Sequence, residues 1–485
     1  MSRTPVILLV AHHGMAARYL LRTEVFSTLR AGGARIVIVT PNFDEPYMQH
    51  EFGGEHVALE PLRTAPELRA TLPWLVRFVI TRVRRYGVAN GHRSRAFKNK
   101  YDGFRAQENG PRARVLGAVV HLGVLAAWRW AAVRRLMLAL EQRLYTPDLH
   151  ADLFARHRPD LVVAASPGIF AADAQLLREA RRHGVRTAAV ILGWDNPTSK
   201  GYRGADVDEL MVWSERMAEQ VETFLDVPRS RSFVAGVPFF DAYQRDDGLP
   251  TRAELFARHD LDPSRRLIVF ATSSPTLWEL NEPIAETLAR AIDVGALGPP
   301  AQLVIRVHPN YRRPGEKTFG GYSAIAERHG HVRVDVPEVR SERLRIDRAA
   351  DDERWLGALF KHCDVLVNVF STTTLEAFLL DRPVVLVAEE VGLDGGSAGR
   401  GWAEFDHLKA LTRYGAGRVA HRLEDIPALV GRALAEPHAD RDARRRVAEE
   451  ECGPLDGRAG ERVGRRLLEL AGAPAPALPA AAVEA

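Results

Sequence analysis

Short apolar runs that alternate with helical spacing constrain the fold of this chain most. The run "VILLVA" at residues 6–11 is continuous, as in a strand that is covered on both faces. Residues 15–30 then place apolar side chains at helical spacing until Gly32 and Gly33, and "RIVIVTP" at 35–41 repeats the strand pattern. The alternation predicts a βαβ start to a parallel sheet.

The strand-helix alternation occurs in two series. The first resumes at "DLVVAASP" (160–167) after a helical, basic segment, and the second runs from "RLIVFATSS" to "PVVLVAEE". Two series predict an α/β protein with two doubly wound, Rossmann-like domains. The expected parts are a first domain at 1–240 with a helical basic insertion at about 62–150, a linker at 241–264, a nucleotide-binding domain at 265–454, a terminal helix at 455–472 and a disordered tail at 473–485.

Composition narrows the class of protein. The chain has 485 residues, 46% hydrophobic and 26% charged, as in soluble globular proteins. Its two cysteines cannot form a disulfide framework. We find no signal peptide and no uncharged apolar run of the roughly 18 residues needed to cross a bilayer. A cytoplasmic protein is expected.

Basic residues concentrate at 77–114. This segment contains eleven Lys and Arg but only two acidic residues, Asp102 and Glu108, and its basic residues are interspersed with aromatic ones. The apolar run that follows, 115–128, is expected to form a buried helix. One interpretation is a solvated basic loop followed by a core helix. The other is a surface at 77–135 that binds anionic lipid head groups, which would place the protein on the inner face of the plasma membrane. No nucleic-acid module accompanies the charge, so no nucleic-acid partner is expected.

The segment "NVFSTTTLEAFLLDRPVVLVAEE" (368–390) contains a hydroxyl-rich turn between two apolar runs. Thr373 and Glu376 have the spacing of a capping box, which would explain the pattern by itself. A helix N-terminus also presents free N–H groups and partial positive charge, which favour a diphosphate.

This segment resembles the nucleotide-sugar site in the second domain of GT-B glycosyltransferases. The resemblance implies two domains facing across a cleft, with Ser371, Thr372 and Thr373 as ligands of the donor diphosphate and Glu376 as the ribose ligand. The turn in "VFATSSPTLWE" (269–279) is similar to a second phosphate loop of that fold, which implies donor contacts by three hydroxyl residues, namely Thr272, Ser273 and Ser274.

Two further segments resemble the CDP-glycerol glycerophosphotransferase group, which shares this fold. They are "VIRVHPN" (304–310) and "GPLDGRAGERV" (453–463). His308 is expected to bind the donor or act in catalysis, although a histidine at a strand end also caps backbone carbonyls. Arg306 alternates with His308 and is expected on the same face, where it would stabilise the departing nucleotide. GT-B enzymes generally work without a metal, so no metal or cofactor is expected.

The loop after the first strand, "AHHGMAARYLLRT" (11–23), faces the cleft in GT-B enzymes. His12 or His13 would act as the general base, and the alternative is that one of them is a polar surface residue. Arg18 and Arg22, one helical turn apart, would bind an anionic acceptor.

The loop "GWDNPTSKG" (193–201) crowds polar residues at a strand end. Asp195 would act as a base or orient an acceptor hydroxyl, and Trp194 would stack on a sugar. Asn196 and Lys200 are the other expected acceptor contacts. The alternative is an Asx-turn made by Asp195 and Asn196.

These features predict a glycosyltransferase that moves a sugar from a nucleoside-diphosphate sugar to a hydroxyl of a lipid-linked or cell-surface polysaccharide acceptor. The alternative is a CDP-glycerol-type glycerophosphotransferase that builds a teichoic-acid-like polymer. A UDP-sugar 2-epimerase and a non-catalytic membrane-bound scaffold rank below both. The nucleotide, the sugar, the acceptor and the choice of base among His12, His13 and Asp195 stay open.

Overall fold

In the computed structural model the chain divides into two compact units. The first comprises Met1–Phe239 with Arg458–Ala485, and the second comprises Phe240–Gly457. The structure describes residues 4–472 except for gaps at 66–72, 108–109, 202, 246–247, 276–277, 279, 313–318, 342, 345–346 and 389–401. The tail expected at 473–485 lies outside the described residues.

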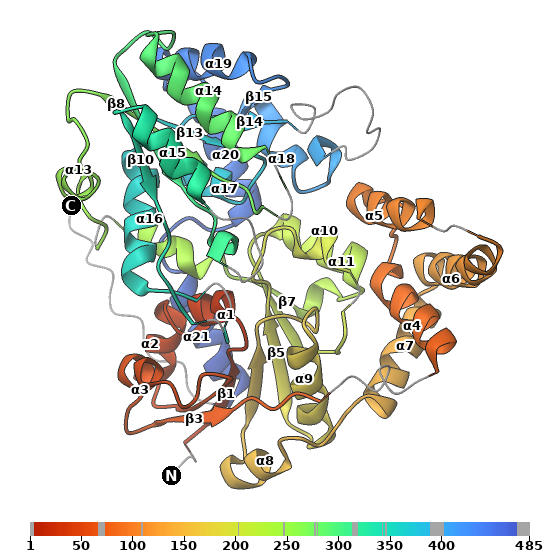
Figure 1. The fold of residues 1–485 in the computed structure, drawn as a ribbon. Helices are drawn as coiled ribbons and strands as arrows, with labels where there is room; N and C mark the ends of the chain where they lie inside the picture. The colour runs from red at the N-terminus through yellow and green to blue at the C-terminus, as the bar shows by residue number, and fades with distance from the viewer. Residues whose placement is uncertain are drawn as a thin grey trace. The chain divides into compact units, whose positions relative to one another are not determined.

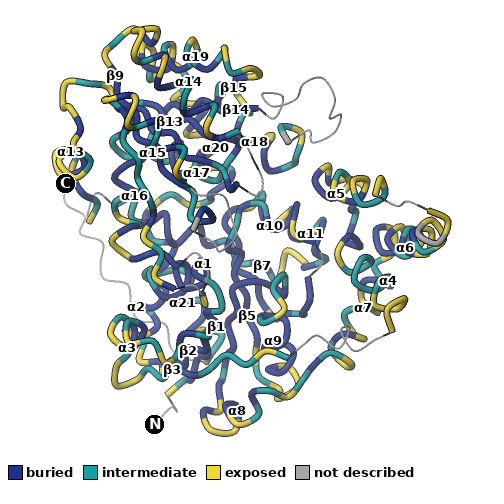
Figure 2. The backbone as a smooth tube through the Cα atoms, viewed as in Figure 1, coloured by how far each residue is buried: buried dark blue, intermediate teal, exposed yellow. Residues whose placement is uncertain are grey.

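A seven-stranded parallel sheet forms the core of the first unit (Figure 1). Its order is β3-β2-β1-β4-β5-β6-β7, so the chain winds outward from β1 to β3, returns to β4 beside β1, and winds outward on the other side. The central strands are buried, which agrees with their continuous apolar runs (Figure 2). The bounds of the strands are β1 Val6–Val10, β2 Arg35–Thr40, β3 Val57–Pro61, β4 Leu161–Ala164, β5 Arg186–Val190, β6 Glu209–Val212 and β7 Ser232–Val234.

Short helices connect these strands. The single helix expected at 15–30 is two helices. Thr23 has an extended backbone conformation between them, and its hydroxyl caps the second helix by accepting from Val25 N at 3.3 Å. The helix at the C-terminal end of the chain, α21, packs on α2. The helices are α1 Gly14–Leu20, α2 Glu24–Ala31, α3 Pro46–Phe52, α8 Ala151–His157, α9 Ala171–Arg182, α10 Asn196–Ser199, α11 Glu215–Leu225 and α21 Ala459–Leu470.

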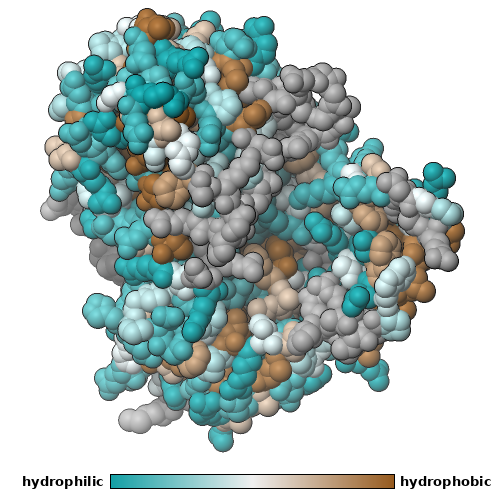
Figure 3. Space-filling view, in the orientation of Figure 1, coloured by the Kyte–Doolittle hydropathy of each residue, from teal (hydrophilic) through white to brown (hydrophobic). Residues whose placement is uncertain are grey.

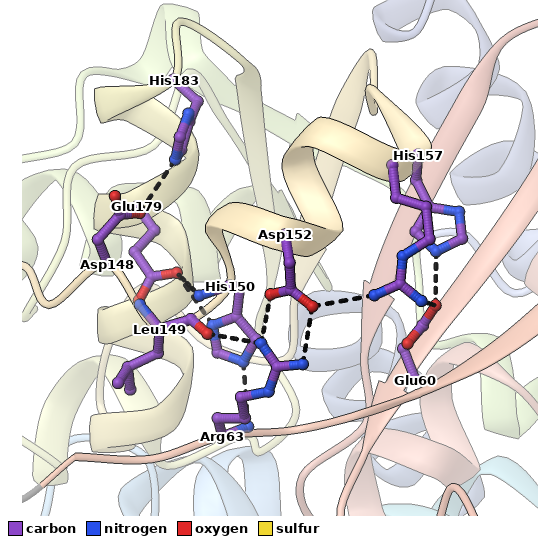
Figure 4. Close-up of polar contacts among 10 residues, drawn as sticks. Glu60, Arg63, Asp148, Leu149, His150, Asp152, His157, Glu179 and His183 are labelled. Atoms are coloured by element: carbon purple, nitrogen blue, oxygen red, sulfur yellow. Dashed lines mark hydrogen bonds and ion pairs between the residues drawn. The ribbon is translucent and has the colours of Figure 1, made fainter.

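The insertion of the first unit is helical, as expected, with α4 Trp74–Tyr86, α5 Arg95–Ala106, α6 Pro111–Arg129 and α7 Ala131–Leu144. A polar network joins the segments that enter and leave it (Figure 4). Arg63, before the insertion, donates to Leu149 O at 2.8 Å and to Asp152 Oδ2 at 2.9 Å, and its backbone N donates to His150 Nε2. Because that ring nitrogen accepts, the Nδ1–H of His150 donates to Glu179 at 2.9 Å. The network anchors both ends of the insertion to α9.

A six-stranded parallel sheet forms the core of the second unit, in the order β10-β9-β8-β13-β14-β15. The chain again winds outward, from β8 to β10, before it returns to β13 beside β8. The strands are β8 Arg266–Ala271, β9 Ala301–Arg306, β10 Val332–Asp335, β13 Val365–Asn368, β14 Val384–Val387 and β15 Arg418–Ala420, with a separate antiparallel pair β11 Val339–Ser341 and β12 Asp347–Arg348. The helices are α12 Asp241–Gln244, α13 Arg252–Arg258, α14 Asn281–Asp293, α15 Gly320–Arg328, α16 Ala350–His362, α17 Thr373–Leu379, α18 Lys409–Thr412, α19 Asp425–Ala435 and α20 Arg441–Cys452.

Both sheets therefore have a point at which the winding direction reverses. It lies between β1 and β4 in the first unit and between β8 and β13 in the second. In doubly wound sheets the carboxyl ends of the two strands beside this point leave a crevice that binds ligands. The two predicted doubly wound α/β domains are confirmed.

Candidate functional site

The turn after β8 is one side of the reversal point of the second unit. Thr272 and Ser274 are buried, and their hydroxyls serve the protein: Thr272 Oγ1 accepts from His308 N at 2.8 Å and Ser274 Oγ accepts from Asn310 Nδ2 at 2.8 Å. Both bonds tie the turn to the residues that follow β9. Ser273 is the partly exposed member of the three predicted donor contacts.

Arg306 is held inside the second unit. Its guanidinium donates to Asp335 Oδ2 and to Asp352 Oδ2, each at 2.7 Å, and the residue is 5% exposed. Burial opposes its charge, but the two carboxylates outweigh that effect and raise the pKa of Arg306. This arrangement joins β9, β10 and α16, and it favours a structural role over the predicted donor contact.

His308 keeps part of its surface in solvent. Its Nδ1 accepts from Asn310 N at 3.0 Å, so the neutral ring carries its proton on Nε2. Of the predicted pair at the end of β9, His308 is therefore the one that keeps part of its surface in solvent.

The turn between β13 and α17 is the other side of the reversal point. Phe370 adopts a left-handed conformation, with φ of 41°, and the backbone then turns directly into the helix. Ser371, Thr372 and Thr373 are all partly exposed at the start of α17. The expected capping box is absent here, because Asn368 Nδ2 donates to Thr373 Oγ1 at 3.0 Å and the helix has no side-chain cap.

Glu376 lies inside the unit rather than at the helix start. It is 4% exposed, and its Oε2 accepts from the hydroxyl of Tyr243 at 2.5 Å. Tyr243 comes from α12, within the segment expected to be a linker. A ribose ligand at this position would share the carboxylate with that hydroxyl.

In the first unit the loop after β1 carries His12 and His13, and the two rings have different surroundings. His12 Nδ1 lies 2.9 Å from Asp173 Oδ1, and Asp173 Oδ2 accepts from Ser166 Oγ at 2.6 Å. Asp173 is fully buried. His13 Nδ1 accepts from Met15 N at 3.2 Å and thereby caps α1. The structure thus brings a carboxylate to His12 across the reversal point between β1 and β4.

Sequence reasoning did not identify Asp173. The signal was a serine directly after a strand and an acidic residue in the first turn of the following helix. Many α/β connections have both features, so the pattern alone does not single out a functional carboxylate.

The two arginines that were expected to bind an acceptor both make contacts within the first unit. Arg18 is 6% exposed, and its guanidinium lies 4.3 Å from the centroid of the Phe239 ring. Arg22 Nε donates to Glu51 Oε1 at 2.7 Å. These contacts explain both residues without an acceptor.

The loop at 193–201 packs tightly. Trp194 is 2% exposed, so its ring face is not open for the predicted sugar stacking, and Asn196 is buried. Asp195 Oδ2 lies 2.9 Å from Lys200 Nζ and accepts from Ser199 Oγ at 2.7 Å. The nearby Asp195 charge raises the pKa of Lys200.

Helix α5 of the insertion and its N-cap residue donate hydrogen bonds to this loop. Ser94 Oγ donates to Thr198 O at 2.9 Å, and Lys100 Nζ donates to Ser199 O at 2.6 Å. Although Lys100 as a whole residue is exposed, desolvation of its ammonium group lowers its pKa to about 8, and the charge of Lys200 acts in the same direction. Lys100 is an amine near the candidate acceptor loop that sequence reasoning did not single out.

The insertion exposes many large apolar side chains, here called its apolar face, which corrects the expectation of a buried helix at 115–128. Eleven of the thirteen exposed large apolar side chains among the described residues lie in α4, α6 and α7 or at the α6–α7 junction. Figure 3 shows apolar residues gathered over this lobe. They are Trp74, Leu75, Val76, Val115, Val119, Leu122, Leu125, Trp130, Leu136, Leu140 and Leu144.

The charges around this face have one sign. Among the described residues of 74–144, ten exposed Lys and Arg face one exposed acidic residue, Asp102. Within the described chain no single helix is long and apolar enough to span a bilayer. Arg114–Arg129 and α7 reach that composition only together, as a pair bent by 107°.

No family model matches the chain, and no curated protein matches its sequence. Solved structures match over nearly its whole length. A UDP-N-acetylglucosamine 2-epimerase is 13% identical with a TM-score of 0.52, and the match covers 97% of each chain. The S. aureus MnaA–UDP co-structure is 12% identical with a TM-score of 0.50, over 96% of each chain.

A glycosyltransferase from Rickettsia africae is 10% identical with a TM-score of 0.50, and the match covers 96% of this chain and 100% of that one. At such identities the likeness concerns the fold alone. It is the GT-B type, with two doubly wound α/β domains.

Proposed function

We propose that this protein is a glycosyltransferase that moves a sugar from a nucleoside-diphosphate sugar to a hydroxyl of a lipid-linked or cell-surface polysaccharide acceptor. One observation carries the proposal. In each unit, residues assigned a chemical role follow both strands beside the reversal point: His12 follows β1 and Asp173 follows β4 in the first unit, and Ser273 follows β8 and Ser371 follows β13 in the second. This is where doubly wound sheets bind ligands.

The proposal assigns donor binding to the second unit. Ser273, Ser371 and Thr372, all partly exposed, would donate to the diphosphate together with the N–H groups at the start of α17. His308 Nε2–H would stabilise the charge that develops on the leaving diphosphate. Glu376 would accept from a ribose hydroxyl while it holds Tyr243.

Acceptor activation is assigned to the first unit, with His12 as the general base. Asp173 Oδ1 lies 2.9 Å from Nδ1 but out of line for a hydrogen bond in this structure. A small turn of the ring would let Asp173 hold the proton of the neutral ring on Nδ1. Nε2 is then the atom that takes the proton from the acceptor hydroxyl. Asp195 is less suited to this role because Lys200 and Ser199 already hold its carboxylate. The proposal includes no catalytic metal.

The acceptor substrate is proposed to be reached on an anionic membrane surface at the inner face of the plasma membrane. The exposed apolar face of α4, α6 and α7 and its excess of Lys and Arg support this, because apolar burial and attraction to anionic head groups together hold interfacial helices. A solvated basic loop would not need exposed Leu122 or Trp130.

A second candidate function is a UDP-sugar 2-epimerase, since solved structures of such enzymes share the fold over the full chain. An epimerase needs no acceptor hydroxyl and no membrane surface. The CDP-glycerol phosphotransferase alternative rests on the segments around His308 and at 453–463.

A thermal-shift screen of the purified chain with UDP-, GDP-, dTDP- and CDP-linked donors tests these functions. A ligand at 100 times its Kd stabilises the folded protein by about 2.7 kcal/mol, which such a screen detects. We expect one sugar nucleotide to raise the melting temperature. We also expect that sugar nucleotide to stay chemically unchanged when it is incubated with the protein but without acceptor. Conversion to its 2-epimer without acceptor would favour the epimerase, and a shift with CDP-glycerol alone would favour the phosphotransferase. No shift with any donor would refute the donor site.

A further inference from the structure

Three metal-ligating side chains converge in the second unit, away from every residue discussed so far. Asp293 ends α14, His329 follows α15, and His331 precedes β10. Their ligand atoms all lie within 4.8 Å of one another. The two imidazole rings are tilted by 56° with centroids 6.0 Å apart, so they approach the carboxylate from different directions.

The second nitrogen of each ring determines which nitrogen faces the carboxylate. His331 Nε2 lies 3.2 Å from Ala289 O and donates to it. Its Nδ1, 3.3 Å from Asp293 Oδ1, then presents a lone pair to a carboxylate oxygen. Two acceptors at this distance repel each other unless a proton on Nδ1 or a metal cation lies between them.

His329 completes the arrangement. Its Nδ1 forms a hydrogen bond of 2.5 Å with Asp293 Oδ2. Its buried Nε2 lies 3.7 Å from Glu286 Oε1, which is too far for a hydrogen bond. A metal-bound histidine typically turns its other ring nitrogen to a carbonyl or a carboxylate, which fixes the tautomer. Ala289 O occupies that position for His331, whereas Glu286 lies beyond hydrogen-bond distance from His329 Nε2.

We propose that Asp293, His329 and His331 bind a divalent transition metal of the Zn²⁺ class through one carboxylate oxygen and two Nδ1 atoms. Imidazole and carboxylate are ligands that Zn²⁺ accepts, and three protein ligands leave one position for water. Asp293 is partly open to solvent, with its side chain 45% exposed, so that position is accessible.

The site lies apart from the candidate donor residues. His331 stands at the amino end of β10, whereas the candidate donor residues follow the carboxyl ends of their strands. A bound ion would link the end of α14, the end of α15 and the start of β10. Without the ion, these three segments are held together by packing and side-chain contacts. The expectation that the reaction needs no metal stays a prediction, and the site does not depend on the proposed function.

Zinc binding by the untagged full chain tests the proposal. The protein is treated with chelator, dialysed, and titrated with Zn²⁺ against a chromophoric competing chelator. We expect one tight equivalent per chain. His331→Gln should weaken it by at least tenfold, the order of loss known for damage to a metal site. If His331→Gln does not fold, as judged by circular dichroism, Asp293→Asn replaces it because it leaves both rings in place.

His362→Gln is the matched control. His362 is also a partly buried histidine of the second unit whose Nε2 contacts a carbonyl, that of Pro250 at 3.0 Å. It should keep the full equivalent of zinc. Absence of a tight equivalent in the wild-type chain, or equal binding by the His331 and His362 variants, would overturn the proposal.

Discussion

Replacement of three apolar residues of α6 with glutamine should weaken membrane binding strongly. Val115, Val119 and Leu122 are 68%, 49% and 68% exposed, which together equal about 1.8 fully exposed side chains. Full burial of one such side chain stabilises by about 1.5–3 kcal/mol, so transfer of this surface into lipid contributes about 3–5 kcal/mol. Because each 1.4 kcal/mol is a factor of ten, the triple variant should bind liposomes about two to four orders of magnitude more weakly.

Glutamine is a good helix former and should leave α6 intact. Val294→Gln is the matched control, because Val294 is 77% exposed but belongs to the second unit. Sedimentation with vesicles of mixed neutral and anionic phospholipids measures the partition coefficient. Neutral vesicles and higher salt should reduce binding of the wild-type chain as well. Equal partition of the triple variant and the Val294 variant would refute the role of the apolar face.

The other predictions concern single side chains of the candidate site. His12→Gln should lower the kcat of sugar transfer by about 10²–10⁴-fold. His13→Gln, which removes the cap of α1, should keep kcat near the wild-type value. Release of nucleoside diphosphate measures both rates, and equal losses would contradict the assignment. Glu376→Gln should weaken nucleotide binding by about tenfold or more, because a hydrogen bond to a charged carboxylate is lost. Tyr243→Phe should weaken nucleotide binding less. Calorimetry measures both affinities, and unchanged affinity of the Glu376 variant argues against a ribose contact. The pKa of Lys100 is lowered to about 8, so its amine is neutral above that pH. The rate of acylation of Lys100, followed by mass spectrometry across a pH series, should therefore have its midpoint near pH 8. A midpoint near the ordinary value of 10.5 would contradict the cause given for the shift.

The central strands could be predicted from the sequence because they are buried on both faces. Every apolar run assigned to a strand, from "VILLVA" to "PVVLVAEE", forms one. The strands missed are β3 and β15, at sheet edges, and the short antiparallel pair β11 and β12, and all four lack such a run. The reversal points also followed, because two βαβ series leave few other windings.

Side-chain roles were harder to predict because they depend on partners distant in sequence. The pattern Thr-x-x-Glu occurs at Thr251–Glu254, where a capping box forms, and at Thr373–Glu376, where it does not. At the second place Tyr243, 133 residues away, holds the glutamate. No local pattern reports such a contact.

The exposed face of α6 was missed for a related reason. Its helical periodicity is clear, but an apolar stripe has the same sequence pattern whether the stripe faces a core, a membrane or a partner protein. Only the packing of α6 on α4 shows which stripe is already covered. Likewise, the carboxylate of Asp173 reaches His12 from a helix more than 150 residues further along the chain.

The place of α21 bears on how the protein is made. The first unit begins at the N-terminus, yet its last helix follows the whole second unit. Gly460 and Gly464 bring α21 against the backbone of α2, since a Cβ at either would lie 3.1 Å from a main-chain atom of that helix. During synthesis this face of α2 stays uncovered until residue 470 has left the ribosome. The second unit can therefore fold first, and the part of the protein translated earliest is the part completed last.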